Sequence, residues 1–356
     1  MRIAYDVSPL SHPRTGVGNF VLGALRALVE LGADVVAFAP LSPLRRHLVD
    51  EALEGVDVER WLPTLPPSHA WRTAWSRLQW PAAERWLGRF DVLHFSDWMY
   101  PPQREGVRAT TIHDLVPMRF PEWTHGRTVR MHRAKYRHAA RTADVIICNS
   151  TRTQRDVHTM LGVPRERMHV AWPAPSPTYT NEGERADLGR PYVLTVATLE
   201  PRKNLETLLA AHELMGGEPA LAVVGAAGWG PQPQLDRPGV IRLGYVGDEE
   251  LARLYRGAAA FAFPSRFEGF GIPVLEAMAS GVPVAVSSDE SLDDAAGGAA
   301  VRADPADPQA LADAIRDAIA RRDELVPKGL AHAAGFTWRR AGEVFLRAYE
   351  QALARL

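Results

Sequence analysis

Two glutamates and two neighbouring cations are the side chains of this sequence whose types and spacing can do chemistry. Glu268 and Glu276 stand eight residues apart in FEGFGIPVLEAMASG, and Arg202 and Lys203 are adjacent in TLEPRKN. A carboxylate accepts hydrogen bonds from sugar hydroxyls, and its two oxygens suit the paired hydroxyls of a ribose. Two cations suit a diphosphate, whose negative charge grows as it departs as a leaving group. These residue types therefore predict a site for sugar hydroxyls and a diphosphate.

Each of these residues also has a plainer interpretation. Glu268 could cap a helix, Glu276 could lie on a solvated helix face, and Arg202 and Lys203 could begin a solvated helix. However, Glu276 lies in PVLEAMASGVPV, which is nearly all apolar, and a carboxylate is costly to bury there without partners. Cations at a helix N-terminus oppose its dipole, which an anionic partner would relieve. Lys203 is also one of three lysines among 41 basic residues. We therefore favour the functional interpretation.

Two further candidates follow strands of the first half. Gly16, in TGVGNF, opens the first predicted helix, where backbone amides can approach an anion. The dinucleotide fingerprint is incomplete because Val21 occupies its third glycine position, and a tight turn explains the glycines equally well. His113, in TIHDL, ends a predicted strand. A structural and a catalytic role are about equally consistent with that position.

Composition excludes several classes of protein. The chain has 356 residues and a formal net charge of −1, which argues against bulk binding to nucleic acid. Its single cysteine, Cys148, cannot form an internal disulfide, and we interpret it as a buried strand residue rather than a nucleophile. We see no signal peptide and no apolar run of about 18 residues that could span a bilayer. The sequence thus predicts a cytoplasmic protein.

Strand and helix signals alternate along both halves of the chain. Short apolar runs predict buried strands in the first half, among them RIAYDV, DVVAFAP, FDVLHFS and ADVIICNS. Others do so in the second half, among them YVLTVAT, ALAVVGAAG, AFAFPS and VPVAVSS. The proline-rich stretch 172–191 between the halves reads as a linker. We therefore expect an α/β protein of two Rossmann-like domains, whose parallel sheets face a central cleft where ligands bind.

Longer motifs make the sequence recognisable. EGFGIPVLEAMASGVPV, which contains Glu268 and Glu276, resembles the E-x7-E element of family 4 glycosyltransferases. LEPRKN, GYVGDEELARLYRGA, IHDL, TGVG and FTWRRAGEVFLRAYEQAL are similar to motifs of the same family and occur in the same order. Two stretches depart from the family's pattern, AWPAP after MHV and DESLDDA. They concern the hinge and the lip of the cleft rather than the donor site.

The resemblance implies a GT-B fold (GT4), with an acceptor domain over 1–175, a nucleotide-sugar donor domain over 176–336 and a C-terminal helix 337–356 that crosses back to the first domain. It implies transfer of a hexose such as mannose or glucose from a nucleotide-diphosphate sugar, with retention of configuration. No cofactor and no metal are expected, in agreement with the absence of an Asp-x-Asp pattern. The base, the acceptor and the linkage stay open.

The resemblance also implies the roles of individual residues. The catalytic set would be His113, Arg202, Lys203 and Glu268. In the donor site, Arg202 and Lys203 would bind the diphosphate and Glu276 would bind the ribose. Glu268, with the backbone of Phe270, Gly271 and Ile272, would bind the transferred sugar, and His113 would lie near its reacting carbon. Gly16 would close on the phosphate, and Tyr245 and Val246 would lie near the base.

Tryptophan and arginine are concentrated between residues 61 and 98. Six of the ten tryptophans lie there, namely Trp61, Trp71, Trp75, Trp80, Trp86 and Trp98, interleaved with Arg72, Arg77, Arg85 and Arg89. This mixture suits peripheral contact with the inner membrane face or an apolar, lipid-linked acceptor. Core packing beneath a solvated arginine face explains it too, and we prefer that interpretation.

Other functions compete with transfer. A nucleotide-sugar epimerase or a phosphorylase-like enzyme would share the GT-B fold, and a non-catalytic subunit would bind the sugar nucleotide without turnover. A nicotinamide oxidoreductase would need the complete glycine fingerprint that is missing here. Turnover of a donor, as opposed to binding alone, separates the enzymes from the binding subunit.

Overall fold

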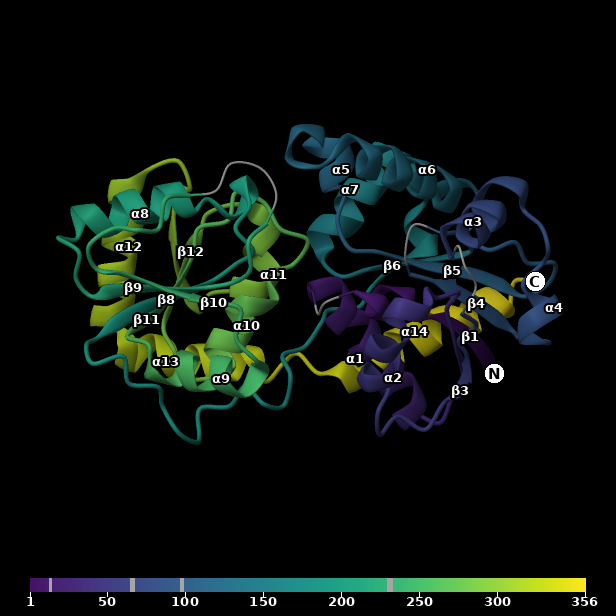
Figure 1. The fold of residues 1–356 in the computed structure, drawn as a ribbon, viewed down its shortest axis with the longest axis horizontal. Coiled ribbons are helices and arrows are strands. Elements are labelled where there is room, and N and C mark those ends of the chain that lie inside the picture. The colour runs from purple at the N-terminus through teal and green to yellow at the C-terminus, as the bar shows by residue number, and fades with distance from the viewer. Residues whose placement is uncertain (13–14, 65–67, 97–98, 229–232) are drawn as a thin grey trace. The chain divides into compact units, whose positions relative to one another are not determined.

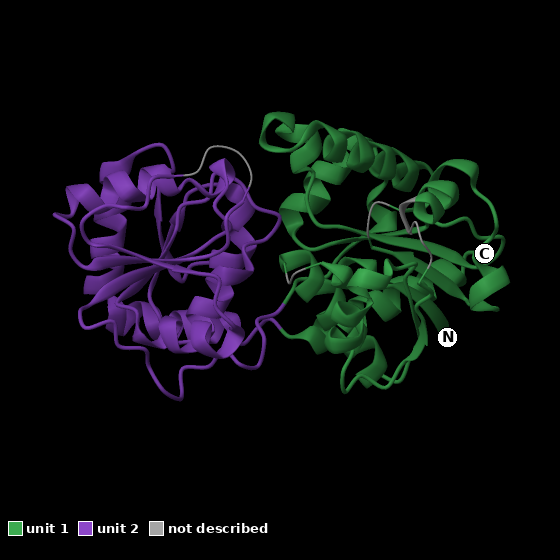
Figure 2. Cartoon of the chain, in the orientation of Figure 1, with its two compact units in different colours: residues 1–173, 337–356 green, residues 174–336 purple. Residues whose placement is uncertain are grey.

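The computed structural model describes residues 1–12, 15–64, 68–96, 99–228 and 233–356. The chain divides into two compact units, coloured separately in Figure 2. Unit 1 consists of residues 1–173 and 337–356, and unit 2 consists of residues 174–336. Two segments therefore join the units, and the first passes between them at residues 173 and 174, near the start of the proline-rich stretch 172–191 that the sequence predicts to be a linker.

Unit 1 is built on a sheet whose strands all pair in parallel. The described residues form seven strands in the order β3-β2-β1-β4-β5-β6-β7. The strands are β1 (Arg2–Asp6), β2 (Asp34–Phe38), β3 (Glu59–Trp61), β4 (Val92–Phe95), β5 (Val107–Ile112), β6 (Val145–Cys148) and β7 (Met168–Val170). The order reverses between β1 and β4, and ligands of such sheets bind at the carboxyl ends of the strands beside that point.

Helices cover both faces of this sheet (Figure 1). They are α1 (Gly16–Glu30), α2 (Arg46–Ala52), α3 (Ser68–Thr73), α4 (Glu84–Leu87), α5 (Val116–Arg119), α6 (Gly126–Thr142), α7 (Thr151–Leu161) and α14 (Trp338–Leu353). Helix α1 starts as the sequence predicts, with Thr15 as its N-cap and buried residues such as Phe20, Leu25 and Leu28 at helical spacing.

The C-terminal helix α14 belongs to unit 1 and packs along α1. The approach is close, since a Cβ atom at Gly342 would lie 2.9 Å from Cβ of Ala27. Buried Tyr349 shares a 2.8 Å hydrogen bond with Nδ1 of His94, whose Nε2 lies 2.9 Å from Oγ1 of Thr111. Burial lowers the pKa of His94 well below its ordinary value, so the ring is neutral. The helix is thus fixed to β4 and β5 by a polar contact as well as by its apolar face.

Unit 2 repeats the design of unit 1. Its described residues form six parallel strands in the order β10-β9-β8-β11-β12-β13. They are β8 (Tyr192–Val196), β9 (Ala220–Val224), β10 (Val240–Gly244), β11 (Ala260–Phe263), β12 (Val284–Ser287) and β13 (Ala300–Ala303). The order reverses between β8 and β11, which places the carboxyl ends of these two strands at the favoured position for a ligand.

Six helices accompany this sheet in the described part of unit 2. They are α8 (Leu205–Leu214), α9 (Asp248–Gly257), α10 (Ile272–Ala279), α11 (Asp293–Ala296), α12 (Pro308–Ala320) and α13 (Arg322–Ala333). Helices α8 and α12 pack on one face of the sheet, and α9 and α10 pack on the other (Figure 1). Buried apolar residues of the strands contribute to the cores on both faces, as expected for parallel strands covered on both sides.

The tryptophan-rich segment forms a cluster of stacked rings in unit 1. Trp71 lies 5.1 Å from Trp86, and Trp61 stacks on both Trp75 and Trp86. Trp75 is completely buried, so this part of the preferred interpretation, core packing, is confirmed. Trp98 lies outside the described residues.

The surrounding arginines follow the preferred interpretation only in part. Arg77, Arg85 and Arg89 are exposed. Arg72 is buried, and its guanidinium donates to the carbonyl of Pro40 at 3.3 Å. The prediction of a solvated arginine face is therefore wrong for this residue, because a main-chain carbonyl takes the place of water. Trp80, in contrast to the clustered rings, is 71% exposed, as is the neighbouring Leu78 at 73%.

Candidate active site

The loop after β8 presents Arg202 and Lys203 in a rigid turn. Residues Pro201–Lys203 form one turn of 3-10 helix, and Asn204 then adopts a left-handed conformation with a φ of 58°. Asparagine tolerates this region better than most residues. The buried amide of Asn204 donates to the carbonyls of Pro264 and Pro305, at 3.1 and 2.7 Å. The loop is thereby tied to the segments that follow β11 and β13.

Glu268 lies between the two cations. One of its oxygens accepts from the Arg202 guanidinium and the other from Nζ of Lys203, each at 2.6 Å. The backbone N–H of Glu268 donates to Oγ of Ser291 at 2.8 Å, and the Lys203 ammonium also lies 5.1 Å from the centre of the Phe263 ring. The three charged groups come from the loops after β8 and β11, the two strands beside the switch point of the sheet.

The charges of this group support one another. Burial alone would raise the pKa of Glu268, but the charges of Arg202 and Lys203 and the hydrogen bond from Lys203 lower it to about 2. Burial and the charge of Arg202 lower the pKa of Lys203, which Glu268 partly offsets. Glu268 therefore stays ionised and holds the two cations together. An ammonium carries three N–H groups and a guanidinium five, which is more than the contacts with Glu268 use. Arg202 also donates to the carbonyl of Phe267 at 3.2 Å and lies 3.6 Å from a carboxylate oxygen of Glu200.

Glu276 lies apart from this group, in helix α10. Its carboxylate is buried, and one oxygen accepts from the hydroxyl of Tyr255 at 3.1 Å. Burial raises the pKa of Glu276 to about 7, against the opposing effect of the Tyr255 hydrogen bond and with a further contribution from Asp248. The plainer interpretation, a solvated helix residue, is therefore wrong. A buried carboxylate that titrates near neutrality is typical of a functional position.

The turn between the two glutamates contains two backbone donors that no described residue uses. Gly271 has a φ of 98°, which favours glycine, and α10 begins at the next residue, Ile272. The N–H groups of Phe270 and Gly271 have no acceptor among the described residues. Tyr245 and Val246 follow β10 at the same edge of the sheet, and Tyr245 is 66% exposed. Donors and aromatic surface thus accompany the charged group along this edge.

Gly16 and His113 belong to unit 1. Gly16 is the exposed first residue of α1. His113 follows β5, where its ring meets the edge of Phe20 with the centres 5.0 Å apart. Its Nε2 is buried without a hydrogen-bond partner in the described part of the chain. Burial and the charge of Lys135 lower the pKa of His113 to about 3, so its ring is neutral near pH 7.

Sequence reasoning missed several residues that hold this site. It gave no role to Tyr255, Ser291 or Asn204, each of which contacts a candidate residue or its loop. Asn204 carried a usable signal, because an asparagine directly before a helix often caps it or takes the left-handed conformation. Tyr255 carried none, since it reads as one more apolar position of α9. Cys148 is buried in β6, where burial raises the pKa of its thiol, in agreement with the structural interpretation.

Two family models match the chain, and together they span most of it. The model described as Glycosyltransferase Family 4 matches residues 14–174, and the model described as Glycosyl transferases group 1 matches residues 190–321. The first covers most of unit 1, and the second covers the candidate residues of unit 2. The chain belongs to the family 4 glycosyltransferases. The family that the motifs suggested is thereby confirmed.

Proteins with known names resemble this chain over nearly its whole length. The O-antigen chain mannosyltransferase B of Escherichia coli is 28% identical over 98% of this chain and 100% of its own. Sucrose-phosphate synthase from Thermosynechococcus elongatus has a TM-score of 0.72, with 20% identity and full coverage of both chains. Anabaena Alr3699/HepE, solved in complex with UDP-glucose, has a TM-score of 0.70, with 18% identity and full coverage of both chains. The fold is therefore GT-B, as predicted.

Two features are absent from the residues that the structure describes. None of the helices there has the length and apolar character needed to cross a membrane. The same residues hold no group of three or more His, Cys, Asp or Glu side chains placed to ligate a metal ion.

Replacement of Glu276 by glutamine should stabilise the glycosyltransferase in alkaline solution. The folded pKa of about 7 lies above the ordinary 4.5. The group's stabilising contribution is therefore complete below pH 4.5 and is lost as the pH rises through 7. Because glutamine does not ionise, Glu276→Gln avoids this loss in the free energy of unfolding, which amounts to roughly 3 kcal/mol at most. We expect a melting temperature several degrees above wild type at pH 8 and little difference at pH 5. Equal melting temperatures at pH 8 would contradict the raised pKa.

Proposed function

We propose that this glycosyltransferase moves a hexose from a nucleotide-diphosphate sugar to an acceptor hydroxyl, with retention of configuration and without a metal ion. The observation that carries the proposal is the ion-paired group of Arg202, Lys203 and Glu268 beside the switch point of the second sheet. It supplies two fixed cations for a diphosphate leaving group and one carboxylate for the sugar hydroxyls. Since these groups are already in position, little reorganisation is needed as charge develops on the leaving group.

The other residues complete a donor site in this proposal. Glu276 accepts the two ribose hydroxyls, and the free amides near Gly271 bind the transferred sugar. Tyr245 and Val246 lie near the base. Unit 2, which contains these residues, is then the donor domain, and unit 1 is the acceptor domain. Gly16 closes on the phosphate from unit 1, and His113, whose neutral ring keeps Nε2 available, contacts the sugar near its reacting carbon.

A screen of donors tests this proposal. Purified enzyme is incubated with GDP-, UDP- and ADP-hexoses, and release of the nucleoside diphosphate is measured with and without candidate acceptors. The names of the relatives give mannose and UDP-glucose, so nucleotide-linked mannose and UDP-glucose are the first donors to try. Proton NMR of the first product gives its anomeric configuration. Turnover with retention supports the proposal, an inverted product refutes retention, and binding without turnover identifies a non-catalytic subunit.

Activity should persist in EDTA. The two cations beside Glu268 take the place that a divalent ion would have at a leaving diphosphate, so we expect the rate to stay within about twofold of the untreated enzyme. The rate is measured after dialysis against EDTA and again with Mg²⁺ or Mn²⁺ restored. A strict need for the added ion would show that Arg202 and Lys203 do not suffice.

We also propose peripheral contact with an anionic membrane through the exposed tip of the tryptophan-rich segment. Leu78 and Trp80 are each more than 70% exposed, and the exposed Arg77 stands beside them. Large apolar side chains next to a cation are typical of interfacial binding. The double variant Leu78→Ser/Trp80→Ser should lose cosedimentation with anionic vesicles, whereas Leu44→Ser, at a leucine that is even more exposed, should not. Equal sedimentation of the double variant and wild type would refute this contact.

A further inference from the structure

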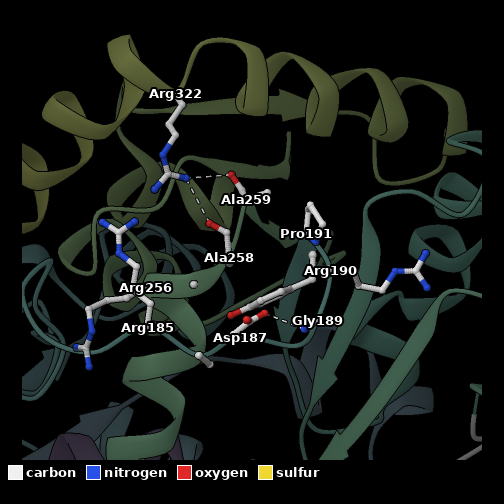
Figure 3. Close-up of a pocket in the computed structure, with 12 residues that line it drawn as sticks. Arg185, Asp187, Gly189, Arg190, Pro191, Arg256, Ala258, Ala259 and Arg322 are labelled. Atoms are coloured by element: carbon white, nitrogen blue, oxygen red, sulfur yellow. Dashed lines mark hydrogen bonds between the residues drawn. The ribbon is translucent and has the colours of Figure 1, made fainter.

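A second basic site lies in unit 2, in a pocket with a volume of about 540 Å³ (Figure 3). The loop 185–192, the end of α9 and the first residue of α13 line it. Its floor is the start of β8 at Tyr192 and the residues just before β11. The donor residues follow the opposite ends of these same strands. At about 3.3 Å per residue, strands of four or five residues separate the two sites by roughly 15 Å.

Two arginines of the pocket are held in place by the main chain. Nε of Arg256 donates to the carbonyl of Glu184 at 2.6 Å. The guanidinium of Arg322 donates to the carbonyls of Ala258 and Ala259, at 3.3 and 3.2 Å, as the dashed lines of Figure 3 mark. Within the described ranges, neither arginine forms an ion pair with a carboxylate. Their charges are therefore fixed in position without being neutralised.

A third arginine, Arg185, adds to this charge. It is exposed, and it has no hydrogen bond or ion pair with the part of the chain that the structure describes. Burial and the charge of Arg185 lower the pKa of Arg322, while Asp323 opposes them, so the cations repel each other across the pocket. Arg322 also stands at the first position of α13, where a cation opposes the helix dipole.

The remaining charged groups of the pocket do not offset this excess. Asp187 lines it, but one of its oxygens accepts the backbone N–H of Gly189 at 2.8 Å. Arg190 is paired with Glu218. Three guanidinium groups thus line the pocket with one acidic side chain, and Pro191, Ala258 and Ala259 add apolar surface to the lining.

We infer that this pocket is a second anion site, which binds a phosphate monoester such as a phosphorylated sugar. A guanidinium matches the geometry of phosphate oxygens, and three of them favour a dianion. The volume lies within the range of small-molecule sites and exceeds what a phosphate ion fills, so the ester's organic part has room against the apolar wall. Lipid headgroups and soluble esters both carry this phosphate chemistry, and the test separates them.

Calorimetry with glucose 6-phosphate tests the inference on the whole chain. Arg185→Glu reverses an exposed charge that has no hydrogen bond or ion pair among the described residues, so the fold should survive, which thermal melting checks. Arg242→Glu is the matched control, because Arg242 is likewise exposed and without a partner in the described residues, but lies outside the pocket. We expect Arg185→Glu to weaken binding at least about tenfold. Arg242→Glu and Lys203→Ala should stay within about twofold of wild type.

Vesicles of phosphatidylcholine containing phosphatidic acid provide the lipid arm. If the wild type binds the vesicles but not glucose 6-phosphate, and Arg185→Glu abolishes the vesicle binding, the site is supported and a lipid supplies the phosphate. Binding of glucose 6-phosphate that depends on Arg185 supports a soluble ester. The inference is overturned if neither probe binds in an Arg185-dependent way, or if Lys203→Ala alone removes binding, since the donor site would then account for it.

Discussion

We expect Lys203→Ala to lower kcat of this glycosyltransferase by about 100- to 1000-fold, and Arg202→Ala to lower it by a similar factor. Removal of one fixed group that stabilises developing charge typically raises the barrier by about 2.7–4 kcal/mol. Lys203 is almost buried and held 2.6 Å from Glu268, so no mobile neighbour can take over its position. Initial rates at saturating donor, measured with the donor that the screen selects, give the change in kcat.

Lys328→Ala is the control for this loss. Lys328 also pairs with a glutamate, Glu324 at 2.7 Å, but about half of its side chain is exposed to solvent on α13. We expect its replacement to leave both kcat and the melting temperature unchanged, because exposed ion pairs contribute little. A folded Lys203→Ala enzyme whose kcat is within about threefold of wild type would show that Lys203 does not serve the diphosphate.

The sequence identifies the members of the charged group but not their contacts. Arg202 and Glu268 each follow an apolar run that ends in polar residues, which predicts two strand ends. The ion pair between them depends on β8 and β11 being neighbours, and strand order is not encoded in any local pattern. The structure therefore adds that Glu268 holds both cations, whereas the motif alone presents them as free to bind a phosphate.

Contacts across long distances in the sequence explain the other differences. Glu276 meets Tyr255 from a different helix, 21 residues earlier, and its apolar surroundings predict a cost of burial without naming the partner. Arg72 reads as solvated because arginine is rarely buried, yet a carbonyl 32 residues away satisfies it. The second anion site combines Arg185, Arg256 and Arg322 from three segments, and no spacing in the sequence connects them.

Glu276 and Glu268 should differ in their effect on binding of the bare nucleoside diphosphate. Glu276 would bind the ribose, which the free nucleotide retains, so Glu276→Ala should weaken binding. Loss of a charged hydrogen-bond acceptor costs roughly 1.5–3 kcal/mol, or about 10- to 150-fold in affinity. Glu268 would bind the sugar, which the free nucleotide lacks. Glu268→Gln also releases Arg202 and Lys203 from their ion pairs, so it should leave the affinity unchanged or raise it.

The pH dependence of the same binding provides an independent test of Glu276. The carboxylate must be ionised to accept two hydroxyls, and its pKa in the free enzyme is about 7. Affinity of the wild type should therefore rise as the pH increases from 6 to 8, whereas Glu276→Gln should show only the titration of the ligand's own phosphate, whose second pKa is near 6. Calorimetry with the diphosphate and then with the intact donor, at each pH, separates the two glutamates. If both variants bind the bare diphosphate as wild type does, Glu276 does not contact the ribose and the division of roles between the glutamates is wrong.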